Sequence, residues 1–401
     1  MAPTFVVVGA GLAGGAAAGT LRELGFDGRI VVLGEEEDPP YERPPLSKQY
    51  LRGEQPLSYL YPRAWYEEQD VDLRTGRRVT RIEPAAREVV LSDDERIRFD
   101  RALIATGARN RRLPIPGLDL TGVMDLRTVG EADRIIEAAS AGGRVALVGM
   151  GFIGAEVAAS LRHLRVEVTV IEIFETALYR VLGPEIGRVV EAFHRDHGVD
   201  MRFGESVDRF EGDGLVEAVV TKSGQRIECD FAVVGIGVQP NVEAVSGIAA
   251  ENGIPVDATL QTDVPGVFAA GDVAVHEHPV FGRIRVEHYD NALKMGAAAA
   301  RNMLEAGEVF DDPHWFWSDQ YDMELQMAGV ALSWDQLVVR GSMEDRSFTG
   351  FYLSNGVLRS VVSVNRGRDV RRSMPLIRAA IRPDPAALRD EDVDLRSLLP
   401  A

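Results

Sequence analysis

The length, composition and charge of the chain limit both its architecture and its partners. It has 401 residues, 45% of them hydrophobic, so it can bury large cores but is too long for one, and about two or three domains are expected. The net charge of −18 argues against a general nucleic-acid-binding surface. No apolar run approaches the ~20 residues of a membrane span, and the first residues lead directly into an expected strand. The sequence therefore predicts a cytoplasmic protein without a signal peptide.

The chain begins with a strand, a glycine turn and a helix in the order typical of dinucleotide binding. Four apolar residues follow Thr4, glycines stand at Gly9, Gly11 and Gly14, and an alanine-rich helical pattern comes next. The first glycine allows the sharp turn, the second lets a pyrophosphate approach the free amides of the helix, and the third lets the helix pack on the strand. Glu35 closes the next expected strand about 20 residues later, where a carboxylate can bind a ribose diol.

A second copy of this pattern follows, with Gly149, Gly151 and Gly154 in the turn and Glu172 at the end of the next expected strand. One such glycine pattern is weak evidence, but two copies with strand, helix and acid in the same order predict that the chain binds two dinucleotides. No arginine stands immediately beside Glu172, and its carboxylate would repel the extra phosphate of NADP. NADH is therefore the expected nicotinamide cofactor.

Three further segments contain glycine or proline at positions that suggest ligand contact. The segment PPYERPPLSK, residues 39–48, has two Pro-Pro pairs and by itself predicts a rigid surface loop. Residues 103–108, LIATGA, and 267–274, VFAAGDVA, predict buried strands that end beside glycine. Asp272 in the latter is either a helix cap or a carboxylate that binds sugar hydroxyls.

The stretch WFWSDQYD, residues 315–322, concentrates four aromatic rings among polar side chains, although aromatic residues make up only 7% of the chain. It follows neither the helical nor the strand period of a buried element. We therefore expect a flat ligand beside it, with core packing an equal alternative for Trp315 and Phe316.

The cysteine and the histidines predict neither a disulfide nor a metal site. Cys229 is the only cysteine and is expected to be a small buried thiol. His276 and His278, like His194 and His197, have a spacing that could suggest a metal, but no further clustered ligand joins either pair. These histidines are expected in loops or on the surface.

One basic segment contrasts with the acidic average. Between Asn365 and Arg372 it contains four arginines: Arg366, Arg368, Arg371 and Arg372. Such a run is either an ordinary solvated face or a docking patch.

The order of these motifs resembles the two-dinucleotide flavoprotein reductases, and most closely the NADH-dependent ferredoxin reductases that serve haem monooxygenases or ring-hydroxylating dioxygenases. The resemblance covers essentially the whole chain, from GAGLAG through PPLSK, LIATGA, GMGFIGAE, VGIGVQPN, AAGDVA and WFWSDQYD to VNRGRD. It implies an α/β fold of the glutathione-reductase type, in which an NAD domain is inserted in an FAD domain. Both would be Rossmann-like, and a small α+β domain would follow. The expected limits are 1–112 and 243–320 for FAD, 113–242 for NADH and 321–401 for the C-terminal domain.

The resemblance also implies site residues. For FAD they are Gly9, Gly11, Ala13, Gly14, Glu35, Arg43, Lys48, Val79, Thr106, Gly107, Arg127, Asp272 and Tyr289, with Trp317 nearest the flavin ring. For NADH they are Gly149, Gly151, Phe152, Ile153, Gly154, Glu172, Gly235 and Gly237. Glu156, expected in the first turn of its helix, could simply complement the helix dipole. The resemblance implies instead that Glu156 pairs with Lys48 beside the reactive flavin nitrogen, where the lysine stabilises negative charge on the reduced ring.

The implied activity is hydride transfer from NADH to FAD, followed by single-electron transfer to an iron-sulfur ferredoxin. The arginine run would then form part of the ferredoxin dock, with Arg109, Arg111 and Arg112 as the second candidate. Two alternatives remain: a reductase resembling monodehydroascorbate reductase, and a redox-controlled interaction protein resembling apoptosis-inducing factor. Disulfide reductases carry a cysteine pair, and related NADH oxidases a single cysteine, near ERPPLSK, so this chain is expected to share neither chemistry.

Overall fold

The computed structural model describes residues 2–248, 250 and 252–400. The chain forms two compact units, each assembled from three segments. Unit 1 comprises Met1–Glu42, Ser58–Arg109 and Gln239–Phe316, and unit 2 comprises Arg43–Leu57, Asn110–Val238 and Trp317–Ala401. In the part of the chain that the structure describes, no helix combines the length and apolar character that crossing a bilayer requires.

Unit 1 is built on a parallel five-stranded sheet with the order β19-β7-β1-β2-β3. The central strands are buried along nearly their whole length, as expected where both faces of a parallel sheet are covered. The strands are β1 (Thr4–Val8), β2 (Arg29–Leu33), β3 (Val71–Arg74), β7 (Arg101–Ile104) and β19 (Val267–Ala269).

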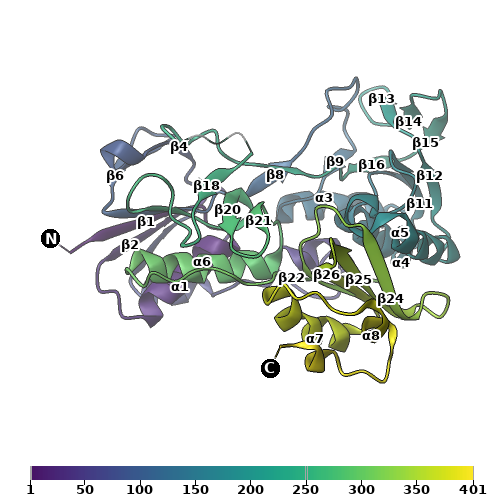
Figure 1. Ribbon diagram of the computed structural model, residues 1–401. Helices are drawn as coiled ribbons and strands as arrows, with labels where there is room; N and C mark the ends of the chain where they lie inside the picture. The colour runs from purple at the N-terminus through teal and green to yellow at the C-terminus, as the bar shows by residue number, and fades with distance from the viewer. Residues whose placement is uncertain (1, 249, 251, 401) are drawn as a thin grey trace. The chain divides into compact units, whose positions relative to one another are not determined.

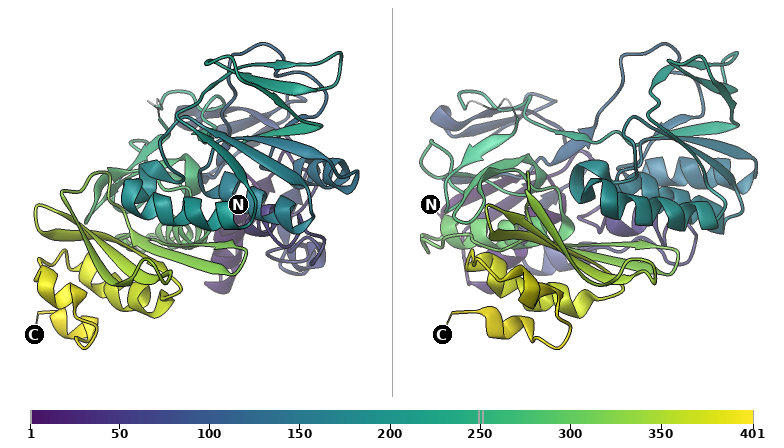
Figure 2. Two further views of the ribbon diagram at one scale, coloured as in Figure 1. Left: turned by 90° about the vertical axis from the view of Figure 1, so that its right-hand side faces the viewer. Right: turned by 45° about the vertical axis from the view of Figure 1, so that its right-hand side comes forward.

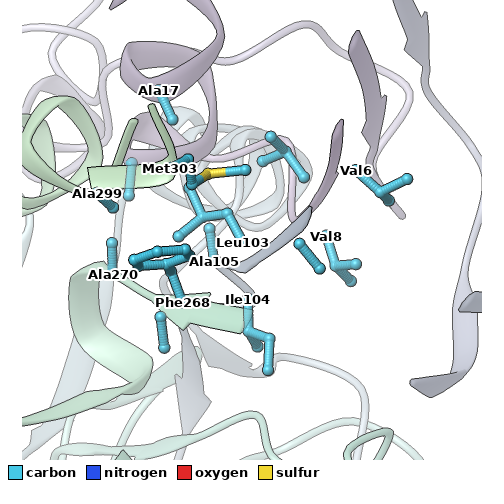
Figure 3. Close-up of a cluster of buried hydrophobic side chains, with 14 of the residues drawn as sticks. Val6, Val8, Ala17, Leu103, Ile104, Ala105, Phe268, Ala270, Ala299 and Met303 are labelled. Atoms are coloured by element: carbon cyan, nitrogen blue, oxygen red, sulfur yellow. The ribbon is translucent and has the colours of Figure 1, made fainter. Parts of the chain in front are cut away.

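Two helices of unit 1, α1 (Leu12–Glu23) and α6 (Tyr289–Met303), lie side by side (Figure 1). Small residues allow this packing, because a Cβ on Gly296 of α6 would lie 2.2 Å from the backbone oxygen of Ala13 in α1. Alanines of both helices and apolar residues of the sheet form one buried cluster, part of which Figure 3 shows around Leu103, Phe268 and Met303. The core thus fixes α1, and with it the first glycine turn, against the sheet.

The remaining elements of unit 1 are smaller. They include two three-stranded sheets, β4-β5-β6 and β18-β20-β21. Their limits are β4 (Val79–Glu83), β5 (Glu88–Leu91), β6 (Arg96–Arg98), β18 (Ile254–Val256), β20 (Ala274–His278) and β21 (Gly282–Ile284). Unit 1 also contains α2 (Arg63–Glu68) and the 3-10 helices η2 (Pro84–Ala86) and η3 (Gly271–Val273). The chain passes between the units within β8 (Ala108–Asn110), β17 (Val238–Pro240) and β22 (Trp315–Gln320) and in the loops near residues 42 and 57.

Unit 2 repeats the parallel architecture with a five-stranded sheet of order β12-β11-β10-β16-β9. Its strands are β9 (Val123–Asp125), β10 (Arg144–Val148), β11 (Glu167–Glu172), β12 (Asp200–Phe203) and β16 (Phe231–Val234). An antiparallel sheet adds β13 (Val207–Glu211), β14 (Ala218–Thr221) and β15 (Arg226–Glu228). The helices of this part are η1 (Pro44–Ser47), α3 (Val129–Ser140), α4 (Phe152–His163) and α5 (Tyr179–Asp196).

The C-terminal part of unit 2 is an antiparallel sheet of order β22-β23-β26-β25-β24. Figure 2 shows α7 (Gly367–Arg378) and α8 (Pro385–Arg389) on one side of this sheet. The other elements are β23 (Met323–Gly329), β24 (Gln336–Ser342), β25 (Ser347–Ser354), β26 (Val357–Val364) and the 3-10 helix η4 (Leu395–Leu398).

The structure corrects one expectation about this sheet. The stretch WFWSDQYD was expected to follow neither regular period, but residues Trp315–Gln320 form β22, an edge strand. Ser318 and Gln320 are completely buried, whereas Trp317 and Asp319 are half-buried. The strand period was missed because the buried face of β22 carries polar side chains rather than apolar ones.

The fold class expected from the sequence is confirmed, since each of two parallel sheets contains a strand that leads through a glycine turn into a helix, and a mixed α/β part completes the chain. The three-domain limits stay a prediction.

Candidate active site

The first glycine turn lies between β1 and α1 in unit 1, and its three glycines differ in what requires them. Gly9 has a φ of +119°, and a Cβ there would lie 2.1 Å from the backbone oxygen of Ala105. A Cβ on Gly14 would lie 2.0 Å from the backbone oxygen of Gly9. A Cβ on Gly11 would meet nothing within 4 Å. The fold therefore requires Gly9 and Gly14, while the open space at Gly11 fits the approach of a phosphate to the helix amides.

The second glycine turn, between β10 and α4 in unit 2, also has two glycines that the backbone requires and one that faces open space. Gly149 has a φ of +101° and its Cβ would lie 2.5 Å from the backbone oxygen of Gly235, while a Cβ on Gly154 would lie 2.2 Å from that of Gly149. Gly151 again faces open space. Both turns thus retain a cradle that a side chain would fill, and both fit a dinucleotide.

This difference gives a prediction for the second turn. We expect Gly151→Ala to fold like the parent protein but to bind NADH at least about tenfold more weakly, because the methyl group occupies the phosphate approach. Gly154→Ala should instead lower the melting temperature, because its Cβ would clash with backbone. Calorimetric titration with NADH and thermal unfolding measure both effects. Unchanged NADH affinity in Gly151→Ala would contradict the assignment of this turn.

The two acidic residues expected at the ribose positions have different surroundings. Glu172, at the end of β11, is buried, and its carboxylate accepts hydrogen bonds from the amides of Met150 at 2.6 Å and Phe174 at 2.9 Å. These amides fix the carboxylate beside the second glycine turn. Glu35 lies two residues beyond β2, with 71% of its side chain exposed, and Arg78 Nε is 3.7 Å from it. Glu172 is therefore held in place, whereas Glu35 is open to solvent.

The structure contains the Lys48–Glu156 ion pair that the resemblance implied. Lys48 Nζ lies 2.6 Å from Glu156 Oε2, with 5% and 2% of the two side chains exposed. Lys48 directly follows η1, where two prolines fix the chain direction, and Nζ also donates to the carbonyl of Pro44 at 3.2 Å. A buried ion pair of this kind is costly to break, because removing one partner leaves an uncompensated charge.

The position of Glu156 corrects the expectation that it lies in the first helical turn. Helix α4 begins at Phe152, so Glu156 is its fifth residue and lies in the second turn, buried on the face that packs toward η1. Complementing the helix dipole does not explain a carboxylate at this depth. Its hydrogen bonds do: Ser47 Oγ donates to Oε2 at 2.5 Å and Ser318 Oγ donates to Oε1 at 2.7 Å. Sequence reasoning missed both serines, which have no distinctive spacing.

Six further FAD candidates belong to unit 1. Thr106 follows β7 and donates through its hydroxyl to the carbonyl of Asn241, and the Tyr289 hydroxyl donates to Glu42 at 2.7 Å. Burial raises the pKa of Tyr289, so its hydroxyl stays protonated. Asp272 is buried within η3, after Gly271 with φ +77°, and is not a cap residue. Ala13, Val79 and Gly107 lie in α1, in β4 and after β7.

The remaining FAD candidates belong to unit 2. The Arg43 guanidinium donates to the carbonyl of Arg127 at 2.6 Å, which ties the segment before η1 to the residues before α3. Trp317 lies in β22, half-buried, directly before Ser318. Trp317 is therefore adjacent in sequence to a residue that binds Glu156.

The other NADH candidates surround the second turn. Phe152 and Ile153 begin α4, and 46% of Ile153 is exposed. Gly235 follows β16 beside Gly149, and Gly237 has a φ of +103°, a conformation that favours glycine.

Comparison with known proteins identifies the family. Residues 3–296 match the family described as pyridine nucleotide-disulphide oxidoreductase, and residues 315–399 match a reductase C-terminal domain. The chain belongs to the pyridine nucleotide-disulphide oxidoreductase family.

Two relatives and one solved structure match this chain along nearly their whole length. Rhodocoxin reductase of Rhodococcus erythropolis is 37% identical over 98% of this chain and 93% of its own. The anthranilate 1,2-dioxygenase system ferredoxin–NAD(+) reductase component of Burkholderia cepacia is 38% identical over 99% of this chain and 100% of its own. A chain in the crystal structure of the covalent putidaredoxin reductase-putidaredoxin complex superposes with a TM-score of 0.95 at 34% identity, covering 99% of this chain and 98% of that chain.

The disulphide chemistry in the family's description does not apply to this member. Cys229 is the only cysteine in the chain, and it is buried. Burial raises the pKa of its thiol to about 11, so it remains protonated near neutral pH. Residues 1–401 therefore cannot supply an internal cysteine pair.

The histidines correct an expectation, because three of the four weighed as metal ligands are buried rather than in surface positions. His276 and His278 lie in β20, and His194 lies in α5. Burial lowers the pKa of His194 and of His276 to about 4, so both are neutral near pH 7. Across residues 2–248, 250 and 252–400, no group of three or more candidate ligands could hold a metal ion.

The arginine run lies at the start of α7 and is partly neutralised. Arg366 pairs with Asp369 at 3.3 Å and Glu391 at 2.6 Å, and Arg372 lies 3.8 Å from Asp394. Arg368 and Arg371 are exposed, and no ion pair is found for them within the described part of the chain. The arginines of the second candidate dock also have partners. Arg109 pairs with Glu243, Arg111 donates to the carbonyl of Val238, and Arg112 pairs with Asp125.

Proposed function

We propose that this protein is an NADH-dependent ferredoxin reductase that supplies electrons to a monooxygenase or dioxygenase. What carries the proposal is the match of nearly the whole chain to reductases such as the anthranilate 1,2-dioxygenase system ferredoxin–NAD(+) reductase component, together with the match of residues 315–399 to a reductase C-terminal domain. FAD, when bound, supplies the chemistry that accepts a hydride and releases electrons one at a time. A cytoplasmic location also remains part of the proposal.

In this proposal the two turns have separate tasks. The turn at Gly9–Gly14 binds FAD. The turn at Gly149–Gly154 binds NADH, and Glu172 orients its ribose diol. Lys48 presents a positive charge from a buried position, and Glu156 holds that ammonium group in place. Because Lys48 carries a charge that water does not screen, it can stabilise negative charge that develops on the flavin ring.

The decisive experiment is anaerobic titration of the purified protein with NADH, followed by addition of candidate ferredoxins. The expected result is bleaching of the flavin band by one equivalent of NADH, then its return as the iron-sulfur band of the ferredoxin changes. Turnover with monodehydroascorbate but not with any ferredoxin would favour the first alternative enzyme. Slow oxidation, a long-lived charge-transfer complex and dimerisation on reduction would favour a redox-controlled interaction protein.

We expect the purified protein to be yellow and to hold one FAD per chain without a covalent bond. The reason is that the Gly9–Gly14 turn leaves open space at Gly11 where a pyrophosphate fits. Absorbance of the protein, and of the supernatant after acid precipitation, measures the content and the linkage. A colourless protein that takes up no FAD on reconstitution would refute the assignment.

The arginine run is the proposed ferredoxin dock, because ferredoxins are typically acidic and a reductase with a net charge of −18 needs a local positive face to attract one. We expect Arg371→Glu/Arg372→Glu to lower the ferredoxin association rate about tenfold or more at low salt and to weaken its salt dependence. Stopped-flow mixing at several ionic strengths measures both.

One control variant and one variant of the second candidate dock accompany this variant. Arg202→Glu/Arg226→Glu changes the net charge equally on other surface strands and should leave ferredoxin turnover intact. Arg111→Glu/Arg112→Glu tests the second candidate. Reduction of ferricyanide should be unaffected in all three. If Arg371→Glu/Arg372→Glu lost ferredoxin reduction and ferricyanide reduction together, the docking assignment would be wrong and α7 would present an ordinary solvated face. The same conclusion would follow if the variant kept both activities.

A further inference from the structure

A chain of buried side chains in unit 2 leads away from the Lys48–Glu156 pair. Ser318 Oγ donates to Glu156 Oε1 at 2.7 Å, Gln320 Nε2 donates to Ser318 Oγ at 3.0 Å, and His194 Nε2 lies 2.9 Å from Gln320 Oε1. The Tyr321 hydroxyl lies 3.4 Å from His194 Nδ1. The four residues from Glu156 to His194 are each at most 2% exposed.

The direction of these hydrogen bonds is the same at every step. The Gln320 amide nitrogen donates to Ser318, so its oxygen faces His194 and can only accept. His194 therefore carries its hydrogen on Nε2, and its Nδ1 accepts from Tyr321. Burial lowers the pKa of His194 to about 4, which keeps the ring neutral near pH 7. Every donor in the chain thus points toward the Glu156 carboxylate.

Three elements supply this chain. Glu156 comes from α4, Ser318 and Gln320 from one face of β22, and His194 from α5. Alternate residues of a strand share a face, so Ser318 and Gln320 necessarily point the same way. This explains why the aromatic stretch is too polar for a core strand: its buried face connects Glu156 to α5.

We propose that Ser318, Gln320 and His194 are positioning residues that hold the Glu156 carboxylate toward Lys48. Consecutive hydrogen bonds polarise one another, so the three residues act on the carboxylate as one donor. Oε2 accepts from Lys48 and Ser47, and the chain occupies Oε1, which prevents the carboxylate from rotating away. The proposal rests on the role of the Lys48–Glu156 pair proposed above.

The test compares variants along the chain by two readouts, the single-turnover rate of flavin reduction by NADH and the reduction potential of the bound FAD. We expect Ser318→Ala to slow reduction about tenfold, because a hydrogen bond to a charged group is lost. It should also lower the potential, since the bare carboxylate offsets the Lys48 charge more completely. Ser318→Thr keeps the hydroxyl and should retain most of the parent rate and of the parent reduction potential.

Ser363 provides a matched control. It is fully buried in β26 of the same sheet and, in the described structure, its hydroxyl has no partner. Ser363→Ala should leave both readouts unchanged. In a Lys48→Met background, Ser318→Ala should have no further effect, because the chain acts through Lys48. If Ser318→Ala disturbs folding, His194→Phe, at the far end, should still lower the rate and the potential by a smaller factor.

The outcomes separate the positioning role from the proposed function. The positioning role would be overturned if Ser318→Ala changed the rate and the potential no more than Ser363→Ala does. It would also be overturned if the effect of Ser318→Ala were equally large in the Lys48→Met background. Because the potential is measured by dye equilibration without NADH or ferredoxin, a shift that persists in a protein unable to reduce any ferredoxin would support positioning while refuting the proposed function alone.

Discussion

Replacing Lys48 by methionine is expected to slow flavin reduction by NADH by roughly a hundredfold or more, a magnitude typical of removing one buried electrostatic contact from a reacting centre. Methionine has a similar length and packing volume but no charge, so both glycine turns should still bind their nucleotides. Anaerobic stopped-flow mixing of the FAD-loaded variant with NADH measures the rate. An unchanged rate of flavin reduction in a variant fully loaded with FAD would show that Lys48 has only a structural role.

The same substitution should also affect stability, and the two effects can be separated. Lys48→Met leaves Glu156 buried without its partner, which typically costs about 3–5 kcal/mol. Adding Glu156→Gln removes the unpaired charge and should recover much of that loss without restoring the reduction rate. If the double variant reduced FAD at the parent rate, the slow reduction would result from the stranded carboxylate rather than from the missing ammonium.

The second large effect concerns the choice of nicotinamide. We expect NADH to exceed NADPH in catalytic efficiency by roughly thirty- to a thousandfold, because losing a ribose contact and adding repulsion costs about 2–4 kcal/mol. Two backbone amides fix the Glu172 carboxylate, so it cannot easily turn away from the added phosphate. Steady-state kinetics with both nucleotides measures the ratio.

A pair of variants isolates the charge of Glu172. Glu172→Gln should shrink the preference for NADH at least about tenfold, mainly by lowering efficiency with NADH. Glu167→Gln removes the same charge from the exposed start of β11 and should leave the preference unchanged. Comparable efficiencies for NADH and NADPH in the parent protein would show that Glu172 does not have this role.

The sequence by itself determined the features that depend on neighbouring residues. The two strand–turn–helix units were legible because each needs its glycines at fixed short spacings, and the structure shows Gly9, Gly14, Gly149 and Gly154 at positions where a Cβ would meet backbone. The fold class followed from the family resemblance that the order of these motifs carries.

Only the tertiary structure decided which distant side chains meet. Nothing in the spacing of Lys48, Glu156 and Ser318 indicates contact, and family resemblance alone suggested the ion pair. The polar face of β22 was missed because strand prediction relies on apolar alternation, which fails where a strand buries hydrogen-bonded groups instead. The histidines were misplaced for a similar reason. Burial depends on what packs against a segment, and in this chain the residues that pack against one another are often more than a hundred positions apart.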